Sequence, residues 1–402
     1  MIKKFKHIFI DSFWSISGLV LMNFVAQFFV YPLWNKMMGQ EIYGNIIFYI
    51  SLMNIFSITF GSACCYARIT KSSEYDTENE DYISVLIYTT IAVAFIFTAI
   101  AVFYKKEMRA ADAVLYIVLC CLTLWRSYAD VEFRLNLNYI GYFTYFVVIS
   151  AGYILGGSLL KVFGLWTVSL LPGELFGLLF VLKKGSVFKI KRRLTIKDKT
   201  MVKLFIILCV SYLLNSIIFN SDRLLLKAAI GGSAVSVYYV SSLFGKTMSL
   251  ITTPFNSVIS GYLAKYKGSL TIRLMTVTVL LLSIIIVAAA LMCTLGSYIV
   301  LPFLYSDLFE KAKGAFFICN ISQTFYFGTN ILTVMLLRFS ENKFQIYINI
   351  VYALAFLLIC LPFSFFGGLK GFYWGYLTTS MVRFAFSAGV GYYTVFEMEK
   401  NL

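Results

Sequence analysis

About twelve apolar runs of 18 or more residues dominate this sequence, and they constrain the fold more than any other feature. A helix needs a run of this length to cross the ~30 Å hydrocarbon core of a bilayer. Because 60% of the residues are hydrophobic and 13% are charged, a soluble enzyme, a disordered scaffold and a nucleic-acid-binding domain are excluded. The runs also lack the alternation of apolar and polar residues found in membrane β-strands. We therefore predict an all-α polytopic membrane protein.

The runs predict about twelve transmembrane helices in two groups of six. The predicted ranges are 10–34, 44–67, 82–104, 112–133, 139–162, 164–182, 203–221, 233–259, 272–301, 314–338, 344–366 and 371–395. The longest stretch between helices, 183–203, holds nine Lys or Arg residues against one Asp. We expect an N-terminal lobe at 1–182, a basic, solvated linker at 183–202 and a C-terminal lobe at 203–402.

Basic residues divide unevenly between the two ends of these helices. The end with both termini and the linker holds 22 of the 34 Lys and Arg residues, the opposite end holds 10, and two lie inside helices. The positive-inside rule therefore places both termini and the linker in the cytoplasm. All eight cysteines lie in apolar runs and the single histidine is His7, so we predict no disulfide, metal site or cofactor.

Two short segments are related by a faint internal repeat. MGQEIYG at 38–44 and IGGSAVS at 230–236 are offset by 192 residues, and each opens a long helix. Repeated halves around a cavity are typical of alternating-access transporters.

These segments also carry a resemblance to a known family. Tyr31 and Pro32, followed by segment 38–44, are similar to the first helical hairpin of the Wzx-type polysaccharide-lipid flippases, members of the multidrug/oligosaccharidyl-lipid/polysaccharide (MOP) superfamily. Segment 61–68, in which Arg68 closes the second helix, also resembles that family. Further similar positions are Asn220 to Gly231, Tyr238, Tyr239, Pro254 and segment 302–309, in which the usual glycine is missing.

The resemblance implies a MATE-like fold of two six-helix lobes that rock about a central cavity. It implies transfer of undecaprenyl-pyrophosphate-linked oligosaccharides, such as O-antigen or capsule repeat units, to the outer leaflet of the bacterial cytoplasmic (inner) membrane. The implied partners are this lipid-linked sugar, membrane lipid, a polysaccharide polymerase with its chain-length machinery, and a coupling proton or sodium ion. Nucleic acid is not among them.

Three basic residues are candidates for the substrate path. Lys246 and Arg383 lie near the middle of predicted helices, where a charge costs ~2.5–3.5 kcal/mol and needs water, a partner or a ligand. Each either binds the anionic substrate or forms a structural ion pair. Arg68 either receives a phosphate head group or extends to the membrane interface.

Other polar residues are candidates for coupling or for lining the cavity. Glu174, after Pro172 and Gly173, is expected to lie in mid-helix without a visible partner, as a coupling carboxylate or a counter-ion. Asn23, Gln27 and Asn215 either line the cavity or form interhelical hydrogen bonds.

Several groups have a simpler interpretation. Arg126, Asp130 and Arg134 are spaced for an ion-pair ladder on one helix face. Asp222 and Arg223 are expected to form an interfacial pair where the seventh helix ends. Aromatic residues at 363–366 and 372–376 suit an interfacial belt or sugar stacking, and acidic residues at 74–81 suit a solvated loop.

Two other functional classes compete with the flippase. A cation-coupled multidrug antiporter of the same superfamily needs membrane carboxylates, and Glu174 is the only deep one expected here. A membrane enzyme needs a sizeable loop with acidic or metal-binding residues, which this sequence lacks.

Overall fold

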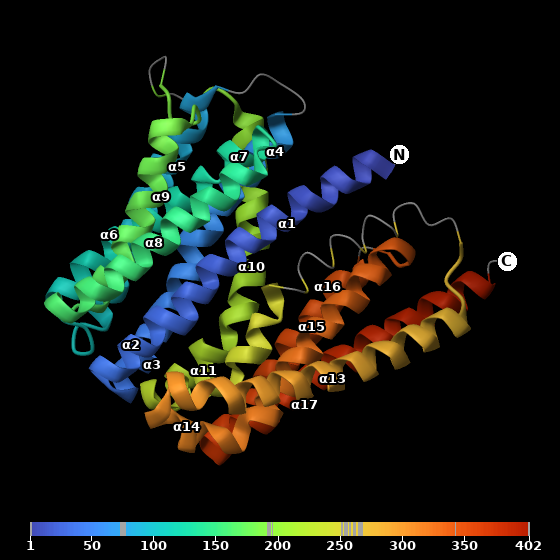
Figure 1. Ribbon diagram of the computed structural model, residues 1–402. Helices are drawn as coiled ribbons and strands as arrows, with labels where there is room; N and C mark the ends of the chain where they lie inside the picture. Colours follow the sequence, from blue (N-terminus) through green and yellow to red (C-terminus); the bar gives the residue numbers. More distant parts are fainter. Residues whose placement is uncertain are drawn as a thin grey trace. The chain divides into compact units, whose positions relative to one another are not determined.

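The computed structural model describes residues 2–72, 78–190, 194, 196–250, 268–341 and 343–400, four isolated positions (252, 256, 259 and 263), and side chains from residue 13 onward. These residues are almost entirely helical, and no strand occurs among them (Figure 1). Helix occupies all twelve predicted ranges, although 233–259 is described only to residue 250 and at three isolated positions. Pro254, residues 191–193 of the basic linker and residues 74–77 of the acidic run lie outside the described residues.

Eight described segments are long and apolar enough to cross a membrane: 13–38, 40–72, 79–103, 110–135, 139–163, 199–229, 272–304 and 343–400. The last one contains two predicted helices. They are separated at Gly368, whose φ of 56° breaks the helical conformation. The protein is therefore a multi-pass membrane protein.

The chain forms two compact units: Met1–Ile42 with Phe48–Ser221, and Tyr43–Ile47 with Asp222–Leu402. The division falls within one long helix, α10 (Lys199–Ala229), whose first part packs with unit 1. The lobes and linker expected from the sequence remain a prediction.

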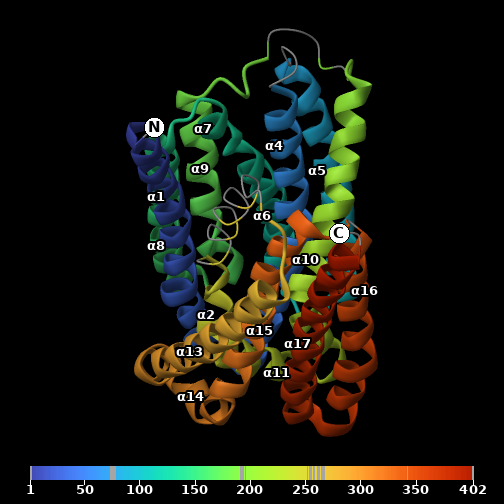
Figure 2. The ribbon, with the colours of Figure 1, turned by 90° about the vertical axis from the view of Figure 1, so that its right-hand side faces the viewer.

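Unit 1 is built on the pairs α1–α8 and α8–α9, which lie side by side (Figure 2). Its helices besides α10 are α1 (Ile2–Val25), η1 (Ala26–Val30), α2 (Tyr31–Met38), most of α3 (Gln40–Met53), η2 (Asn54–Ile58), α4 (Thr59–Ser72), α5 (Asn79–Phe103), α6 (Ala110–Ala129), α7 (Val131–Leu135), α8 (Tyr139–Phe163), η3 (Trp166–Ser169) and α9 (Leu171–Lys184). Local sequence sets several boundaries. Asn138 caps α8 by accepting a hydrogen bond from the Gly141 N–H over 2.9 Å, and Gly164 ends α8 in the left-handed conformation.

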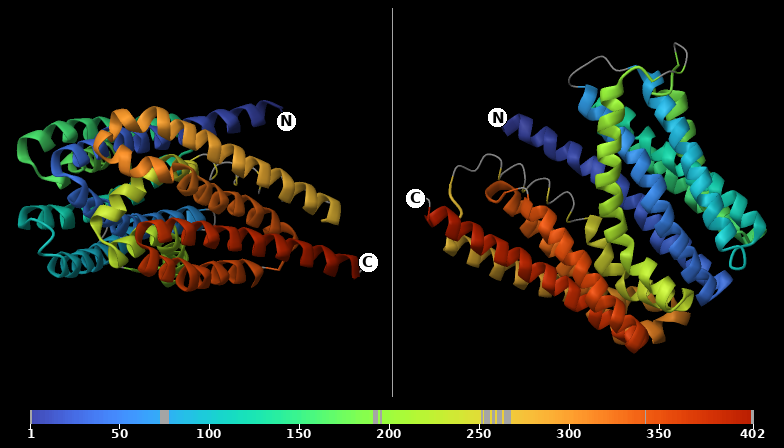
Figure 3. Two further views of the ribbon diagram at one scale, coloured as in Figure 1. Left: turned by 90° about the horizontal axis from the view of Figure 1, so that it is seen from below. Right: turned by 180° about the vertical axis from the view of Figure 1, so that it is seen from behind.

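Unit 2 is built on α13, α15 and α17, which run side by side (Figure 3). Its elements are α11 (Gly232–Thr247), α13 (Ile272–Leu304), α14 (Ser306–Ala312), η4 (Lys313–Ala315), α15 (Phe316–Phe339), α16 (Lys343–Ala355), η5 (Phe356–Cys360) and α17 (Leu361–Lys400). Its apolar core includes Met275, Ile286 and Leu332. Phe372 and Tyr376 are buried within it, whereas Phe366 is 94% exposed, so the predicted aromatic group is part core and part surface.

The two repeat segments have matching backbones. Gly39 has φ 84° and ψ 168°, and Gly231 has φ 116° and ψ −179°. Each glycine is the N-cap of the next helix, α3 and α11 respectively. Only glycine adopts these angles without strain, which is why both segments contain one at this position.

The described part of the basic linker is mostly exposed, but hydrogen bonds attach it to unit 1 at several points. The Glu132 carboxylate accepts hydrogen bonds from the backbone N–H groups of Ser186 and Val187 over 2.7 and 3.0 Å. The Asp81 carboxylate accepts one from the Lys197 N–H over 2.7 Å. Asp81 is buried in the first turn of α5, so this end of the acidic run holds the linker instead of facing solvent.

Candidate functional site

Glu174 lies in the first turn of α9 and has a buried cationic partner. The Arg126 guanidinium of α6 donates from Nε to Glu174 Oε2 over 2.5 Å, and the Tyr153 hydroxyl of α8 donates to Oε1 over 2.6 Å. Glu174 is 2% exposed. The expectation of a mid-helix position is therefore wrong, and the contact with Arg126 agrees with the counter-ion alternative. Arg126 belongs to this pair, while the predicted contact between Arg134 and Asp130 is present at 3.0 Å.

Small residues bring α8 close enough to α9 for this pair to form. A Cβ added at Gly152 would clash with the backbone of Gly173, and one added at Gly156 would clash with the Ser169 carbonyl. Pro172 stands in the first turn of α9, where its missing N–H costs nothing. The first turn of a helix also favours a carboxylate such as Glu174.

Lys246 on α11 is paired with Asp222 on α10. Lys246 Nζ lies 2.7 Å from Asp222 Oδ2, and the Tyr238 hydroxyl donates to the same oxygen over 3.0 Å. Gln323 of α15 donates to the Tyr238 hydroxyl over 2.9 Å. Asp222 is fully buried and lies within α10, which continues to Ala229, so it does not end a helix as expected. The predicted end of the helix at 221 was eight residues too early, and that error hid the partner of Lys246.

Arg383 on α17 is a buried cation of a different kind. Its side chain lies over two aromatic rings, with Cζ 4.5 Å from the centroid of Tyr326 and 5.2 Å from that of Tyr352. One guanidinium nitrogen donates to the Tyr326 carbonyl over 3.4 Å, and Nε has no hydrogen-bond partner. Arg383 is 5% exposed, and no carboxylate pairs with it among the residues that the structure describes. It can therefore accept a further anionic partner.

Arg68 in the last turns of α4 is also buried, and its hydrogen bonds join α4 to α6 and α5. It donates to the Tyr128 hydroxyl and to Asn79 Oδ1, each over 2.5 Å. The Asn79 amide in turn donates to the carbonyls of Ser186 and Lys189, each over 2.9 Å. Arg68 thus reaches the linker through Asn79, and its Nε lacks a hydrogen-bond partner.

The three candidate amides lie in unit 1. Asn23 donates to the Leu19 carbonyl in its own helix over 2.9 Å, Gln27 lies in the π-helical turn η1, and Asn215 is exposed on α10. Neither Asn23 nor Asn215 is a hydrogen-bond partner of Glu174, whose partners are Arg126 and Tyr153 among the described residues.

The buried charges of the two units differ in sign. In the described part of unit 2, Arg223, Lys246 and Arg383 are buried together with a single carboxylate, Asp222. In the described part of unit 1, two buried arginines accompany five buried carboxylates: Glu80, Asp81, Asp112, Glu132 and Glu174. Glu174 is therefore not the only buried acid, and unit 2 is the cationic one.

Comparison with known proteins identifies the fold. No protein-family model matches the chain, and no curated protein matches it in sequence. An inward-facing multidrug-resistance MATE transporter of the MOP superfamily matches with a TM-score of 0.70 at 13% identity, over 96% of this chain and 99% of that one. The lipid II flippase MurJ, inward closed, matches with a TM-score of 0.64 at 13% identity, over 94% and 86%. An outward-facing MATE transporter gives 0.63 at 14% identity, over 97% and 96%.

These neighbours are transporters and a flippase, not enzymes. They include both a multidrug transporter and a lipid II flippase, so the likeness does not separate the two activities. The predicted all-α, MATE-like membrane fold is confirmed, and the chain shares the fold of these MOP-superfamily transporters.

Proposed function

We propose that this protein is a flippase of the Wzx type that moves polyprenyl-pyrophosphate-linked oligosaccharides between membrane leaflets. The observation that carries the proposal is Arg383, a buried guanidinium with no carboxylate partner among the described residues. A buried cation is costly unless it meets an anion, and the pyrophosphate of such a lipid is one. Bidentate hydrogen bonding to phosphate is the chemistry for which arginine is best suited.

The wider charge of unit 2 supports an anionic substrate. Lys246 and Asp222 offset each other at 2.7 Å, which leaves Arg383 as an excess buried cation in the described part of this unit. A cationic drug would be repelled by that excess. On the charge of unit 2 we therefore favour the flippase over the cation-coupled multidrug antiporter. In unit 1, Glu174 is paired with Arg126, and Glu132 and Asp81 accept hydrogen bonds from the linker, so these carboxylates already have partners.

The remaining assignments follow from the same proposal. We place the protein in the bacterial cytoplasmic membrane with both termini in the cytoplasm, working with a polysaccharide polymerase and its chain-length machinery. A coupling proton or sodium ion would act through Glu174 or the amides of Asn23, Gln27 and Asn215. Lys246 and Arg68 remain candidate substrate-path residues that act together with their present partners.

Variants of Arg383 test the proposal in the native host. Deletion of the gene should abolish a surface polysaccharide while its lipid-linked precursor accumulates. Arg383→Gln should lower export about tenfold or more, because a charge-assisted hydrogen bond contributes ~1.5–3 kcal/mol. Arg383→Lys should retain part of the export, since the charge stays but the planar group is lost. Arg383→Glu should be the weakest.

The matched control is Arg338→Gln, which removes an exposed arginine from the same unit. Export and the amount of protein in the membrane should both be normal. Because Arg383→Gln leaves no described carboxylate unpaired, it should also accumulate normally. Normal export by Arg383→Glu at normal protein level would refute the proposal.

A further inference from the structure

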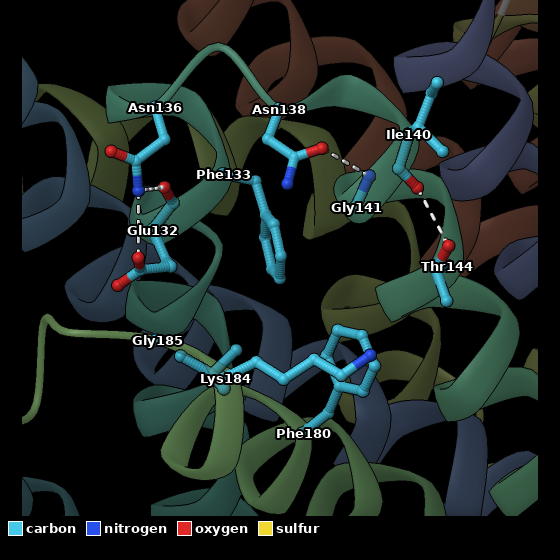
Figure 4. Close-up of a pocket in the computed structure, with 11 residues that line it drawn as sticks. Glu132, Phe133, Asn136, Asn138, Ile140, Gly141, Thr144, Phe180, Lys184 and Gly185 are labelled. Carbon is cyan, nitrogen blue, oxygen red and sulfur yellow. Dashed lines mark hydrogen bonds between the residues drawn. The ribbon is translucent and has the colours of Figure 1, made fainter.

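A separate pocket of about 320 Å³ lies within unit 1, away from the paired charges described above. It is formed by α7, the turn that follows it, the start of α8 and the last turns of α9 (Figure 4). This volume is at the lower end of the range that holds small ligands. Its lining combines an acid, a base, two aromatic rings and two amides: Glu132, Lys184, Phe133, Phe180, Asn136 and Asn138.

The two charges of the pocket stand at opposite ends. Figure 4 shows the Glu132 carboxylate at one side of the space and the Lys184 ammonium at the other, beside the ring of Phe180. Lys184 Nζ lies 4.7 Å from the centroid of that ring. The lining of the pocket therefore has no net charge but carries opposite charges at its two ends. This arrangement suits a ligand with separated positive and negative groups.

Each end retains capacity for a ligand. Glu132 Oε1 accepts from the Asn136 amide over 2.9 Å, and Oε2 accepts the two linker N–H groups of Ser186 and Val187. The Ser186 hydroxyl lies 3.5 Å from Oε1 and 3.4 Å from Oε2. The contacts of the Ser186 hydroxyl are the longest of these, so the donor of a ligand can replace this hydroxyl on Oε1. At the other end, Lys184 forms no salt bridge with any described residue.

The middle of the pocket offers a donor and an apolar surface. Asn138 Oδ1 is used by the Gly141 N–H, whereas the Asn138 amide nitrogen has no partner among the described residues. Figure 4 shows this nitrogen directed toward the space beside Phe133. Leu137 and Ile140, next to the pocket, are 70% and 63% exposed, which gives an acyl chain an apolar surface to follow.

We propose that this pocket binds the zwitterionic head group of a phosphoethanolamine lipid. The lipid ammonium would meet Glu132 and the face of Phe133, by hydrogen bonding and cation–π attraction. The phosphate would meet Lys184 and the Asn138 amide. A head group with only a negative charge would leave Glu132 unmatched, so the pocket discriminates by charge pattern as well as by size. This inference is independent of the proposed transport function.

Lipid retention by the purified full-length protein tests the proposal. The protein is delipidated in detergent and titrated with phosphatidylethanolamine or phosphatidylglycerol, and bound lipid is counted by native mass spectrometry. The wild type should bind phosphatidylethanolamine more tightly. Lys184→Ala should weaken that binding about tenfold, the usual effect of losing one charge-assisted hydrogen bond. Lys183→Ala, which removes the adjacent lysine outside the pocket, should have no effect.

Glu132→Gln tests the other end of the pocket. It should remove the preference for phosphatidylethanolamine over phosphatidylglycerol, and circular dichroism will confirm that the helices remain. Soluble phosphoethanolamine is the third arm. If soluble phosphoethanolamine competes only weakly with the lipid, the site binds the lipid. If it displaces the lipid at equal concentration, the site binds the same head group as a soluble ester. Equal effects of Lys183→Ala and Lys184→Ala, or tighter binding of phosphatidylglycerol by the wild type, would overturn the proposal.

Discussion

Asp222 and Lys246 are separated by 24 residues in the sequence but by 2.7 Å between their charged atoms. Asp222 is fully buried and Lys246 is 8% exposed. Removing one partner of such a pair leaves the other charge buried and uncompensated, which typically costs ~3–5 kcal/mol. This pairing changes what a substitution of Lys246 can report, because a loss of transport could arise from a loss of folding.

A pair of variants separates these effects. Lys246→Ala should lower the free energy of unfolding of the purified protein by about 3–5 kcal/mol, because Asp222 loses its counter-ion. The double variant Lys246→Met with Asp222→Asn should recover most of that stability. Both are measured by thermal unfolding in detergent. Wild-type stability in Lys246→Ala would show that the ion pair does not hold these helices together.

The buried charged residues could be predicted from the sequence, but their partners could not. Lys246 and Glu174 stand out because a charge inside an apolar run is costly, and this holds for any sequence. Their partners depend on which helices pack together. Asp222 was hidden by an early helix end, and Arg126 was assigned to a local ladder because i,i+4 spacing was the only relation visible.

At the scale of elements, the start of a helix can be predicted where the sequence has a glycine that the backbone needs at the N-cap, as at Gly39 and Gly231. The repeat at 38–44 and 230–236 was found from its glycines, and the backbone angles of Gly39 and Gly231 give the physical reason. The π-helical turns η1, η2 and η5 were not predicted, since no residue type specifies the one extra residue of such a turn. The contacts of the linker with Glu132 and Asp81 were missed because hydrogen bonds to backbone N–H groups leave no side-chain pattern.

Substitution of the repeat glycines tests this element. Gly39→Ala and Gly231→Ala should each destabilise the protein by about 1–2 kcal/mol, because φ values of 84° and 116° are strained for any residue with a Cβ. No atom lies within 4 Å of the added Cβ at either site, so the cost would come from the backbone alone.

The control is Gly389→Ala, since Gly389 lies inside α17 with equally open surroundings but without a positive φ. That variant should be neutral or slightly stabilising. Thermal unfolding of the three variants in one detergent provides the comparison. Equal stability of all three would contradict the strain argument.

At the scale of the whole molecule, the multi-pass helical architecture followed from the apolar runs. The orientation rests on the division of 22 against 10 basic residues between the two ends of the helices. Reporters fused at the C-terminus and inserted within 183–203 should both show a cytoplasmic location in intact cells. A reporter that matures outside the cytoplasm at either place would mean that the number of membrane crossings is different.

The central claim is that the substrate is an anionic, lipid-linked sugar. The most direct measurement uses sealed vesicles containing the purified protein and a polyprenyl-pyrophosphate-linked oligosaccharide with a fluorescent sugar. Quenching from outside reports how much substrate lies in the outer leaflet. We expect the protein to move the labelled lipid between leaflets, and Arg383→Gln to slow the movement about tenfold or more. Transport of a cationic dye by the same vesicles, with no movement of the pyrophosphate-linked lipid, would contradict the account.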